Sequence, residues 1–240
     1  MVQGQIALSV VLPAYNEEAN IATTVRKLRL AVGGFETEII VVDDGSTDAT
    51  RRETLKLDVR LLSLSKNQGK GEAVRRGMMQ ATGSVVGLID GDSEIDPASL
   101  ASFVNALENA DIAIGSKRHP QSCVQAPFQR RFLSYGFQTL VRILMGLKVS
   151  DTQTGLKVGR REAIVKILPL LSVKRYAFDV EFLVAAEILG LRIVELPVNL
   201  KLEATFKTKD WARMLYDLLG ITYRLRVTRW YSKKIALIQP

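Results

Sequence analysis

The sequence is poor in the side chains that usually build thiolate, zinc or triad-type active sites. Its 240 residues include one cysteine, Cys123, and one histidine, His119. A single cysteine excludes an internal disulfide and favours a reducing compartment. The same scarcity leaves no zinc-binding spacing and no nucleophile–histidine triad.

Long apolar runs are also missing. No run approaches the roughly 20 residues that a helix needs to span a bilayer. The opening MVQGQIALSVVLPAY lacks the basic leader of a secretory signal. A hydrophobic content of 47% with 24% charged residues is nevertheless ordinary for a globular protein with a real core. We expect a protein that is soluble or lies on a membrane surface.

Acidic residues are outnumbered, with 25 Asp and Glu against 33 Lys and Arg, which gives a net charge of +8. The excess is concentrated in residues 201–240, which carry nine basic and three acidic residues. Such a balance favours an anionic partner: a nucleotide, a lipid headgroup or nucleic acid. Nucleic acid is the weakest of these candidates because no stacking platform or recognition helix stands out.

Short apolar runs alternate with amphipathic stretches through the first half of the chain. The runs that we interpret as strands are residues 6–13, 37–44, 59–65, 84–90 and 111–116. This alternation predicts an α/β fold of the Rossmann-like kind, with a mostly parallel sheet flanked by helices. Ligands of such sheets bind beyond the carboxyl ends of the strands. The polar motifs PAYNEE, DDGSTD, DGDSE and GSKRH each follow an apolar run.

The second half is predicted element by element. We expect a mobile loop at 117–130, helices at 130–147, 161–171 and 178–190, a short strand within 149–160, and one strand at 191–203. Residues 1–204 then form one domain, and residues 205–240 form a basic amphipathic helical extension. Its aromatic ends, Trp211 and Trp230, are typical of a membrane-surface helix. A helix packed on the sheet with a solvated basic face is the alternative.

The stretch LIDGDSEIDP places Asp90 and Asp92 one residue apart after an apolar run. On extended backbone the two carboxylates point the same way, and hard oxygen ligands suit Mg²⁺ or Mn²⁺. Gly91 allows the backbone to approach a ligand closely, and Glu94 is a candidate third ligand. The alternative is a solvated turn followed by a helix that Asp96 caps.

Two further motifs lie at strand ends. Asp43 and Asp44 in VVDDGSTD are placed to hydrogen-bond a ribose or a base edge, although Asp44 or Ser46 could instead cap a helix. In PAYNEE, the Tyr15 ring could pack on a base and Glu17 could accept hydrogen bonds. The alternative for this motif is a helix start that Asn16 caps.

The stretch KNQGKGEAVRRG sets Lys70 between two glycines before a helix. It resembles a phosphate-binding loop, but it lacks the spacing of a P-loop.

Taken in order, these motifs resemble family 2 glycosyltransferases with the GT-A fold. The later segments GSKRH, VSDTQTGLKV, AFDVEFLVAAE, VELPVNL and DWARMLYDLLGITYRLR resemble the dolichyl-phosphate glucosyltransferase branch, whose close relatives are dolichyl-phosphate mannosyltransferases. The resemblance covers about residues 6 to 230. It implies transfer of a sugar from a nucleotide donor to a polyprenyl phosphate.

The resemblance also implies residue roles. The nucleotide sugar would be held by Pro13, Ala14, Tyr15, Glu17, Asp43, Asp44, Lys70, Asp90, Gly91 and Lys117. A divalent cation, Mg²⁺ or Mn²⁺, would be held by Asp90, Asp92 and Glu94. Catalytic and acceptor-side roles would fall to Asp92, Arg118, Arg131 and Asp151. The family usually has arginine at position 117, and lysine loses the bidentate geometry of a guanidinium.

These expectations combine into one function. The chain is expected to be an inverting, metal-dependent transferase that moves glucose from UDP-glucose to a polyprenyl phosphate at the cytoplasmic face of a membrane, as a peripheral protein. A phosphate acceptor is already ionised at neutral pH, so no strong general base is needed. The alternatives are a GDP-mannose-dependent mannosyltransferase and a non-catalytic binder of nucleotide sugars at the membrane.

Overall fold

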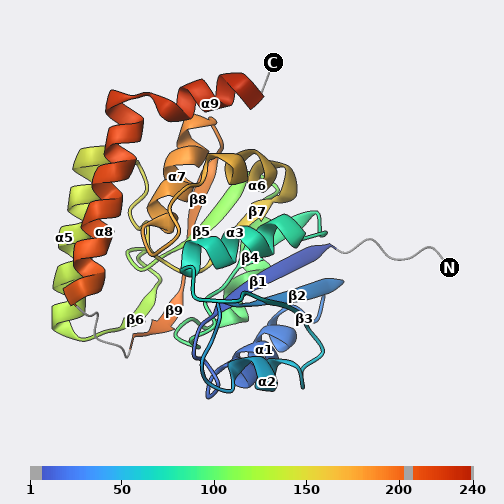
Figure 1. The fold of residues 1–240 in the computed structure, drawn as a ribbon. Coiled ribbons are helices and arrows are strands. Elements are labelled where there is room, and N and C mark those ends of the chain that lie inside the picture. Colours follow the sequence, from blue (N-terminus) through green and yellow to red (C-terminus); the bar gives the residue numbers. More distant parts are fainter. Residues whose placement is uncertain (1–6, 203–207, 239–240) are drawn as a thin grey trace.

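The structure is a computed structural model that describes residues 7–202 and 208–238. Its centre is a seven-stranded sheet in the order β3-β2-β1-β4-β7-β5-β8 (Figure 1). The strands are β1 Leu8–Ala14, β2 Thr37–Asp43, β3 Arg60–Ser63, β4 Val85–Leu88, β5 Ile112–Ser116, β7 Lys157–Arg160 and β8 Ile193–Pro197. All neighbours are parallel except β7, which runs antiparallel to β4 and β5. The predicted mostly parallel α/β sheet is confirmed.

Side chains that alternate along the central strands separate two cores. In β2, Ile39 and Val41 join the cluster on one face, whereas Ile40 and Val42 join the cluster on the other. The first face is covered by α1 Ile21–Ala31 and α4 Leu100–Ala106, which follows a 3-10 turn at Pro97–Ser99. A sheet that is covered on both faces explains why its strands are continuous apolar runs.

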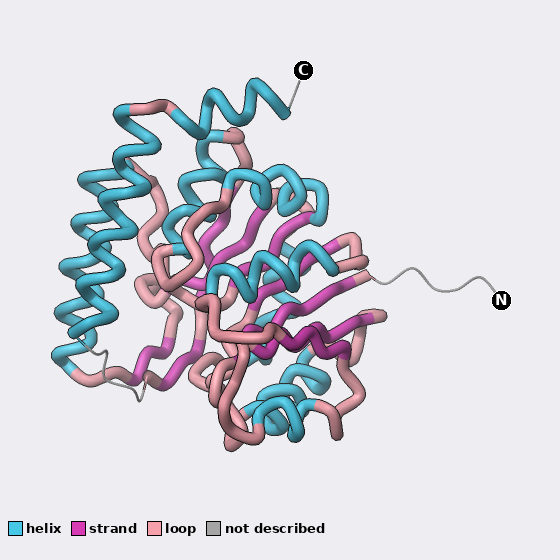
Figure 2. Tube along the Cα trace, in the orientation of Figure 1, coloured by secondary structure: helices cyan, strands magenta, loops and turns pink. Residues whose placement is uncertain are grey.

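Most of the remaining helices contribute to the second core. They are α3 Lys70–Gln80, α5 Phe128–Met145, α6 Arg161–Ile167 with a 3-10 turn at Leu168–Leu170, and α7 Phe178–Ile188. The short α2, Thr50–Thr54, contacts α1 and β2. Figure 2 shows the magenta strands enclosed between cyan helices. The predicted helices at 130–147, 161–171 and 178–190 are confirmed with shifted ends.

Two sequence-based expectations differ from the structure. The segment 117–130, expected to be a loop, contains the strand β6 Cys123–Gln125. The segment 191–203, expected to be one strand, forms β8 and then β9 Asn199–Lys201, which pairs in parallel with β6. The break follows Pro197, whose fixed φ and missing N–H end the main-sheet strand. Because β6 and β9 have three residues each and lie far apart in sequence, the residues around either strand do not indicate that the two strands pair.

The C-terminal helices pack on the rest of the molecule. Helix α8, Thr208–Thr222, lies beside α5 in Figure 1 and is followed by a π-helical turn at Tyr223–Val227 and by α9, Trp230–Ile238. Met214, Leu218, Ile221 and Tyr231 are buried in the second core. The predicted domain boundary at 204/205 lies outside the described residues. None of the described helices combines the length and apolarity needed to cross a bilayer.

Candidate functional site

A cleft of about 620 Å³ opens at the carboxyl-end edge of the sheet. Its floor follows the ends of β1 and β4, and α5, α7 and α8 contribute to its walls. The sequence-predicted residues that line it are Pro13, Ala14, Tyr15, Glu17, Asp44, Lys70, Asp90, Gly91, Asp92, Glu94 and Lys117. The fold therefore brings together motifs that are up to about one hundred residues apart in the chain.

Four predicted residues do not line the cleft: Asp43, Arg118, Arg131 and Asp151. Asp43 is buried at the end of β2, and its Oδ1 accepts a hydrogen bond of 2.9 Å from the Ser46 backbone N–H. It therefore shapes the turn after β2. The position of the other three is described below with their contacts.

The end of the cleft at Tyr15 is built by two turns that hydrogen-bond to one another. Asn16, with a positive φ of 58°, accepts a hydrogen bond from the Thr47 backbone N–H rather than capping a helix. The neighbouring Tyr15 ring is 43% exposed and lines the cleft. An exposed ring beside a polar turn is available to pack on a base.

Asp44 organises the loop before α3. Its two oxygens accept hydrogen bonds of 2.7 and 2.8 Å from the backbone N–H groups of Gln68 and Gly69. Burial raises the pKa of Asp44 although these hydrogen bonds oppose the shift. Gly69 has φ +102°, and a Cβ there would lie 2.4 Å from the Lys174 carbonyl oxygen. This position therefore requires glycine, and Asp44 fixes the loop that presents Lys70.

Lys70 and Asp90 face each other across the floor of the cleft. Lys70 Nζ lies 2.8 Å from Asp90 Oδ1 and 3.0 Å from Oδ2, and the contact with Oδ2 has hydrogen-bond geometry. Asp90 Oδ1 is buried without a hydrogen-bond partner among the described residues. Burial disfavours a charged Lys70, but the carboxylates of Asp179 and Asp90 outweigh it and raise the pKa of this lysine. Lys70 is therefore a permanent cation.

Asp90 and Asp92 form a pair of carboxylates that fits a divalent cation. Burial, and then the charge of Asp90, raise the pKa of Asp92 to about 7. Burial and the neighbouring carboxylate both disfavour the ionised form of Asp92, and a cation bound there would favour it. Hard carboxylate oxygens of this kind match the ligand preference of Mg²⁺ or Mn²⁺, and in this structure those of Asp90 are paired with the Lys70 ammonium. These two aspartates are the residues that would hold the metal.

Glu94, the third predicted metal ligand, is engaged elsewhere in this structure. Arg130 of α5 binds it in a bidentate manner, with Nη1–Oε1 at 3.0 Å and Nη2–Oε2 at 3.1 Å. Within residues 7–202 and 208–238, no three His, Cys, Asp or Glu side chains are grouped to hold a metal. The role of Glu94 as a ligand stays a prediction.

Gly155 makes room for the Asp90 side chain. A Cβ at this position would lie 1.9 Å from Asp90 Oδ2. Gly155 precedes β7, and because β7 is antiparallel, the segment before it reaches the same edge where the parallel strands end. Residues 153–155 line the cleft for this reason. The glycine of the DTQTG motif is thus needed for close approach.

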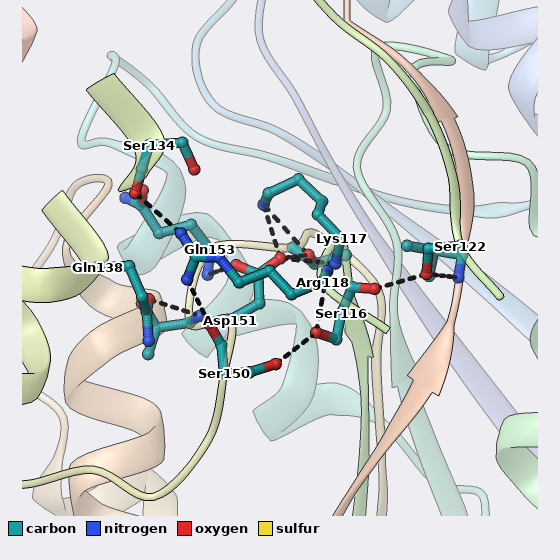
Figure 3. Close-up of polar contacts among 12 residues, drawn as sticks. Ser116, Lys117, Arg118, Ser122, Ser134, Gln138, Ser150, Asp151 and Gln153 are labelled. Carbon is teal, nitrogen blue, oxygen red and sulfur yellow. Dashed lines mark hydrogen bonds and ion pairs between the residues drawn. The ribbon is translucent and has the colours of Figure 1, made fainter. Parts of the chain in front are cut away.

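Lys117 lines the cleft, and Asp151 anchors it from behind. Lys117 Nζ lies 3.0 Å from Asp151 Oδ2, and the same carboxylate accepts hydrogen bonds from the backbone N–H groups of Lys117 and Gln153 and from Thr154 Oγ1 (Figure 3). Burial alone would raise the pKa of Asp151, but Lys117 and these hydrogen bonds lower it to about 2. Asp151 is 3% exposed. The structure places it behind the cleft, where it holds Lys117.

Arg118 and Arg131 lie away from the cleft lining. The Arg118 guanidinium donates to the backbone oxygens of Ser150 and Ser134 (Figure 3). It also lies 4.5 Å from the centre of the Tyr135 ring. It ties the end of β5 to α5. Arg131 is exposed, whereas its neighbour Arg130 lines the cleft. Successive residues on a helix point about 100° apart, so one arginine of this pair faces the cleft.

A second ion pair extends the polar floor into the core. Lys157 Nζ lies 2.6 Å from Asp179 Oδ1, and Asp179 Oδ2 lies 3.4 Å from Lys70 Nζ. Burial would raise the pKa of Asp179, but Lys157 and Lys70 outweigh it and lower the pKa. The charges therefore alternate along a line from Lys157 through Asp179 and Lys70 to Asp90.

Glu181, the other acidic residue of the AFDVEF motif, holds the C-terminal helices. Its side chain is fully buried and accepts hydrogen bonds from Arg224 Nη2 at 2.9 Å and Tyr231 Oη at 2.8 Å. Its other oxygen accepts from the backbone N–H groups of Ser172 and Val173, both at 2.7 Å. Glu181 is thus a structural residue that connects the tail to the loop before α7.

That loop supplies lining residues that sequence reasoning missed. Arg175 and Tyr176 line the cleft, as do Trp211 and Met214 of α8. None of these residues belongs to a motif with a phosphate- or metal-binding spacing. Trp211 was singled out as a membrane-surface residue, and its place in the cleft wall follows from the packing of α8 against α5.

Comparison with known proteins places this geometry in a family. Residues 9–168 match the model of glycosyl transferase family 2. The chain is 35% identical to the mouse dolichyl-phosphate beta-glucosyltransferase over 95% of its length and 78% of that protein. It is 34% identical to the human protein of the same name, over 93% and 77%, and 33% identical to the one from Saccharomyces cerevisiae, over 81% and 67%.

Solved structures give the fold. A crystal structure of glucosyl-3-phosphoglycerate synthase from Mycobacterium tuberculosis has a TM-score of 0.73 at 23% identity, over 91% of this chain and 80% of that one. The same enzyme with Mn²⁺, UDP and glucosyl-3-phosphoglycerate has a TM-score of 0.72 at 21% identity, over 91% and 79%. The protein is a glycosyltransferase: it has the GT-A fold and belongs to glycosyl transferase family 2.

Proposed function

We propose that the protein is an inverting, divalent-metal-dependent glucosyltransferase that moves glucose from UDP-glucose to a polyprenyl phosphate of the dolichyl type. The names of its relatives in mouse, human and yeast support the sugar and the acceptor. The observation that carries the proposal is the cleft in which Asp90 and Asp92 lie with the ammonium groups of Lys70 and Lys117. Such a site suits two anionic substrates and a cation.

The proposed reaction does not need a strong general base. The acceptor oxygen belongs to a phosphate that is ionised at neutral pH, so it attacks without first losing a proton. Glucose is α-linked in UDP-glucose, and a single in-line displacement therefore gives a β-linked product. The protein's task is to align the two substrates and to stabilise the charge that develops on the leaving diphosphate.

The lining residues divide this task. Tyr15 and Asp44 lie where a base and a ribose would be held, and Lys70 lies where the diphosphate would follow. Lys117, held by Asp151, offers its charge to the acceptor phosphate. A divalent cation bound by Asp90 and Asp92 would supply Lewis-acid stabilisation of the leaving group.

A membrane-embedded acceptor calls for a membrane-facing surface, and we propose that α5 and α8 provide it at the cytoplasmic face. Both helices line the cleft and also expose large apolar side chains. These are Phe128, Phe132, Leu133, Tyr135 and Ile143 on α5, and Leu215, Tyr216 and Leu219 on α8. Phe128 and Tyr216 are 81% and 78% exposed. Nearby cations would add about 1 kcal/mol each at an anionic leaflet.

The transfer reaction is tested with the purified protein, a polyprenyl phosphate and either UDP-glucose or GDP-mannose, with Mn²⁺ or Mg²⁺ and with a chelator. We expect glucosyl polyprenyl phosphate from UDP-glucose, and loss of the product when the cation is removed. Equal or faster transfer from GDP-mannose would contradict the choice of sugar. Full activity in the chelator would contradict metal dependence.

Membrane docking is tested by flotation with vesicles that contain anionic lipid. We expect the protein to float with them and Phe128→Ser/Tyr216→Ser to float less. The matched control is Leu55→Ser, because Leu55 is 67% exposed but lies just after α2, outside α5 and α8. An equal loss of flotation in the control, or no loss in the double variant, would contradict the docking surface.

A further inference from the structure

We infer that Asp179 is a positioning residue: its carboxylate, neutralised from behind by Lys157, holds the Lys70 ammonium at the floor of the cleft for the diphosphate of the nucleotide donor. The inference rests on the proposed function, because it assumes that a nucleoside diphosphate occupies this cleft. It assigns a role to two buried residues, Asp179 and Lys157, that the mechanism above does not use.

The three side chains come from three elements. Asp179 lies in the first turn of α7, Lys157 begins β7 and Lys70 begins α3. Asp179 uses Oδ1 for Lys157, at 2.6 Å, and Oδ2 for Lys70, at 3.4 Å. Lys157 Nζ also donates to the Thr154 carbonyl oxygen at 2.6 Å. The carboxylate is therefore fixed at one oxygen and presents the other toward the cleft.

Burial makes this arrangement costly if it serves the fold alone. The side chains of Lys157 and Asp179 are 2% and 5% exposed. Removing two charges from water is expensive, and a well-packed apolar pair of similar size is often as stable or more stable. A buried ion pair that reaches a ligand cleft is therefore better explained by what it does for the cleft. Asp179 itself is among the lining residues.

Lys157 determines how strongly Asp179 holds Lys70. A lone buried aspartate would bind Lys70 tightly and cancel its charge. Because Lys157 already neutralises Asp179 through a shorter contact, Lys70 keeps net positive charge for a second anion. In this structure the second anion is Asp90. Asp90 is also a predicted cation ligand, so Asp179 is the partner that can keep Lys70 in place when Asp90 is engaged by a cation.

The inference predicts a selective defect. Lys70 would contact phosphate and not the nucleoside, so loss of Asp179 should weaken UDP binding and leave uridine binding unchanged. A merely structural role would weaken both ligands alike or lower only the melting temperature. The ratio of UDP to uridine affinity is therefore the informative quantity.

The experiment measures UDP and uridine affinity by calorimetry, with Mn²⁺, for the unmodified 240-residue protein and for Asp179→Asn, Lys70→Met and their combination. We expect Asp179→Asn to lower UDP affinity about tenfold, the factor for one lost hydrogen bond to a charged group. Uridine affinity should stay within twofold. In the Lys70→Met background, Asp179→Asn should add no further loss, because it acts through Lys70.

Two further variants keep the test decisive. Asp179→Asn/Lys157→Met leaves no buried charge unpaired, so it covers the case in which Asp179→Asn alone fails to fold, and it should show the same selective loss. Glu72→Gln is the matched control, because Glu72 is a buried carboxylate on α3 that pairs with Arg75 and Arg76 and does not line the cleft. It should lower stability and leave the UDP-to-uridine ratio unchanged.

The outcomes separate this inference from the proposed function. An unchanged ratio in both Asp179 variants would overturn the inference, as would an equal loss in the Lys70→Met background or in Glu72→Gln. If the unmodified protein bound UDP no better than uridine, the donor assignment of the cleft would fail, and the inference would fail with it. If UDP binds and the ratio is insensitive to Asp179, only the positioning role is wrong.

Discussion

Two lysines reach into the cleft, and each has a buried aspartate behind it, but the two pairs are built differently. Both carboxylate oxygens of Asp151 accept hydrogen bonds from residues close to it in the fold, and Asp151 also pairs with the Lys117 ammonium. Asp179 is neutralised by Lys157 and holds Lys70 through a longer contact of 3.4 Å. Lys70 also has a second carboxylate partner, Asp90.

The difference indicates different tasks. Lys117 is locked in one place, which suits a residue that provides a fixed charge for an acceptor. Lys70 is shared between two carboxylates, one of which is a predicted cation ligand, so its surroundings change with the ligation state of the site. The predictions below test this contrast, from the largest expected effect to the smallest.

The largest effect is expected at the Lys70 side of the cleft, from Asp92→Asn. Asp92 would hold the divalent cation that stabilises the leaving diphosphate, so its loss should reduce the rate of sugar transfer by about 100-fold or more, as measured by product formation at saturating substrates. Asp96→Asn is the matched control, because asparagine caps the following 3-10 helix as well as aspartate does. A variant at position 92 with normal transfer would contradict the catalytic model.

Asp151→Asn should show how much the ionised Asp151 carboxylate contributes to the free energy of unfolding. The pKa of Asp151 is lowered to about 2 in the folded protein. Its stabilisation is therefore present above the unfolded pKa and is lost as the pH falls toward 2. Relative to an unfolded pKa near 4, it amounts to about 2–3 kcal/mol.

The measurement is urea unfolding of wild type and variant from pH 7 to pH 3. The free energy of unfolding should differ between them at pH 7, and the difference should shrink as the solution is acidified. The exposed Asp58 provides a control, since Asp58→Asn should change stability little at any pH. A difference that stays constant down to pH 3 would show that the ionised carboxylate is not what stabilises the fold.

Replacing the two lysines should separate the substrates. Lys117→Met is expected to raise the KM for polyprenyl phosphate about tenfold and to leave UDP affinity unchanged. Lys70→Met is expected to lower UDP affinity about tenfold and to leave the KM for polyprenyl phosphate unchanged. Steady-state kinetics with each substrate varied, together with calorimetry for UDP, measures both. Lys148→Met is a suitable control at an exposed lysine. Identical defects in the two variants would remove the contrast between the pairs.

The smallest effect is expected on α5, where two adjacent arginines point different ways. Arg130→Met should reduce transfer by up to about fivefold, and Arg131→Met should have less effect, since a solvated charge contributes little. Both are compared in the same transfer assay with polyprenyl phosphate. If Arg131→Met is the more damaging change, the sequence-based choice of Arg131 is right and the cleft lining is a poor guide to the acceptor.

Much of the fold and of the cleft floor could be predicted from the sequence because their signals are local. Each of β1, β2 and β4 is an apolar run that ends in a polar motif, and parallel strands bring those ends to one edge. Asp44, Asp90 and Asp92 were found in this way, whereas Lys70 was found from the two glycines that flank it. Asp43 was not separated from Asp44, because only the structure shows that one carboxylate shapes a turn and the other organises the α3 loop.

The walls of the cleft depend on packing between distant segments, and this limited the prediction. The β6–β9 pair joins short strands more than seventy residues apart. The phase of α5, which decides between Arg130 and Arg131, follows from which face is buried against the core. Asp151 was a candidate for a direct role, and its placement behind Lys117 is visible only in three dimensions, as is the contact of Asp179 with Lys70. Arg175 belongs to no motif, and Trp211 belongs to a segment that was interpreted as a membrane-surface helix.

Glu181 has a practical consequence for anyone who shortens this protein. Arg224 and Tyr231 lie near its C-terminal end, where trimming is an obvious way to improve expression. Their removal would leave a fully enclosed carboxylate without two of its donors, a defect worth about 1–3 kcal/mol for each missing bond. The other oxygen of Glu181 steadies the segment that leads to Arg175 and Tyr176. Removing these residues would therefore also disturb the lining of the cleft, and weak activity in such a shortened version would say little about the 240-residue protein.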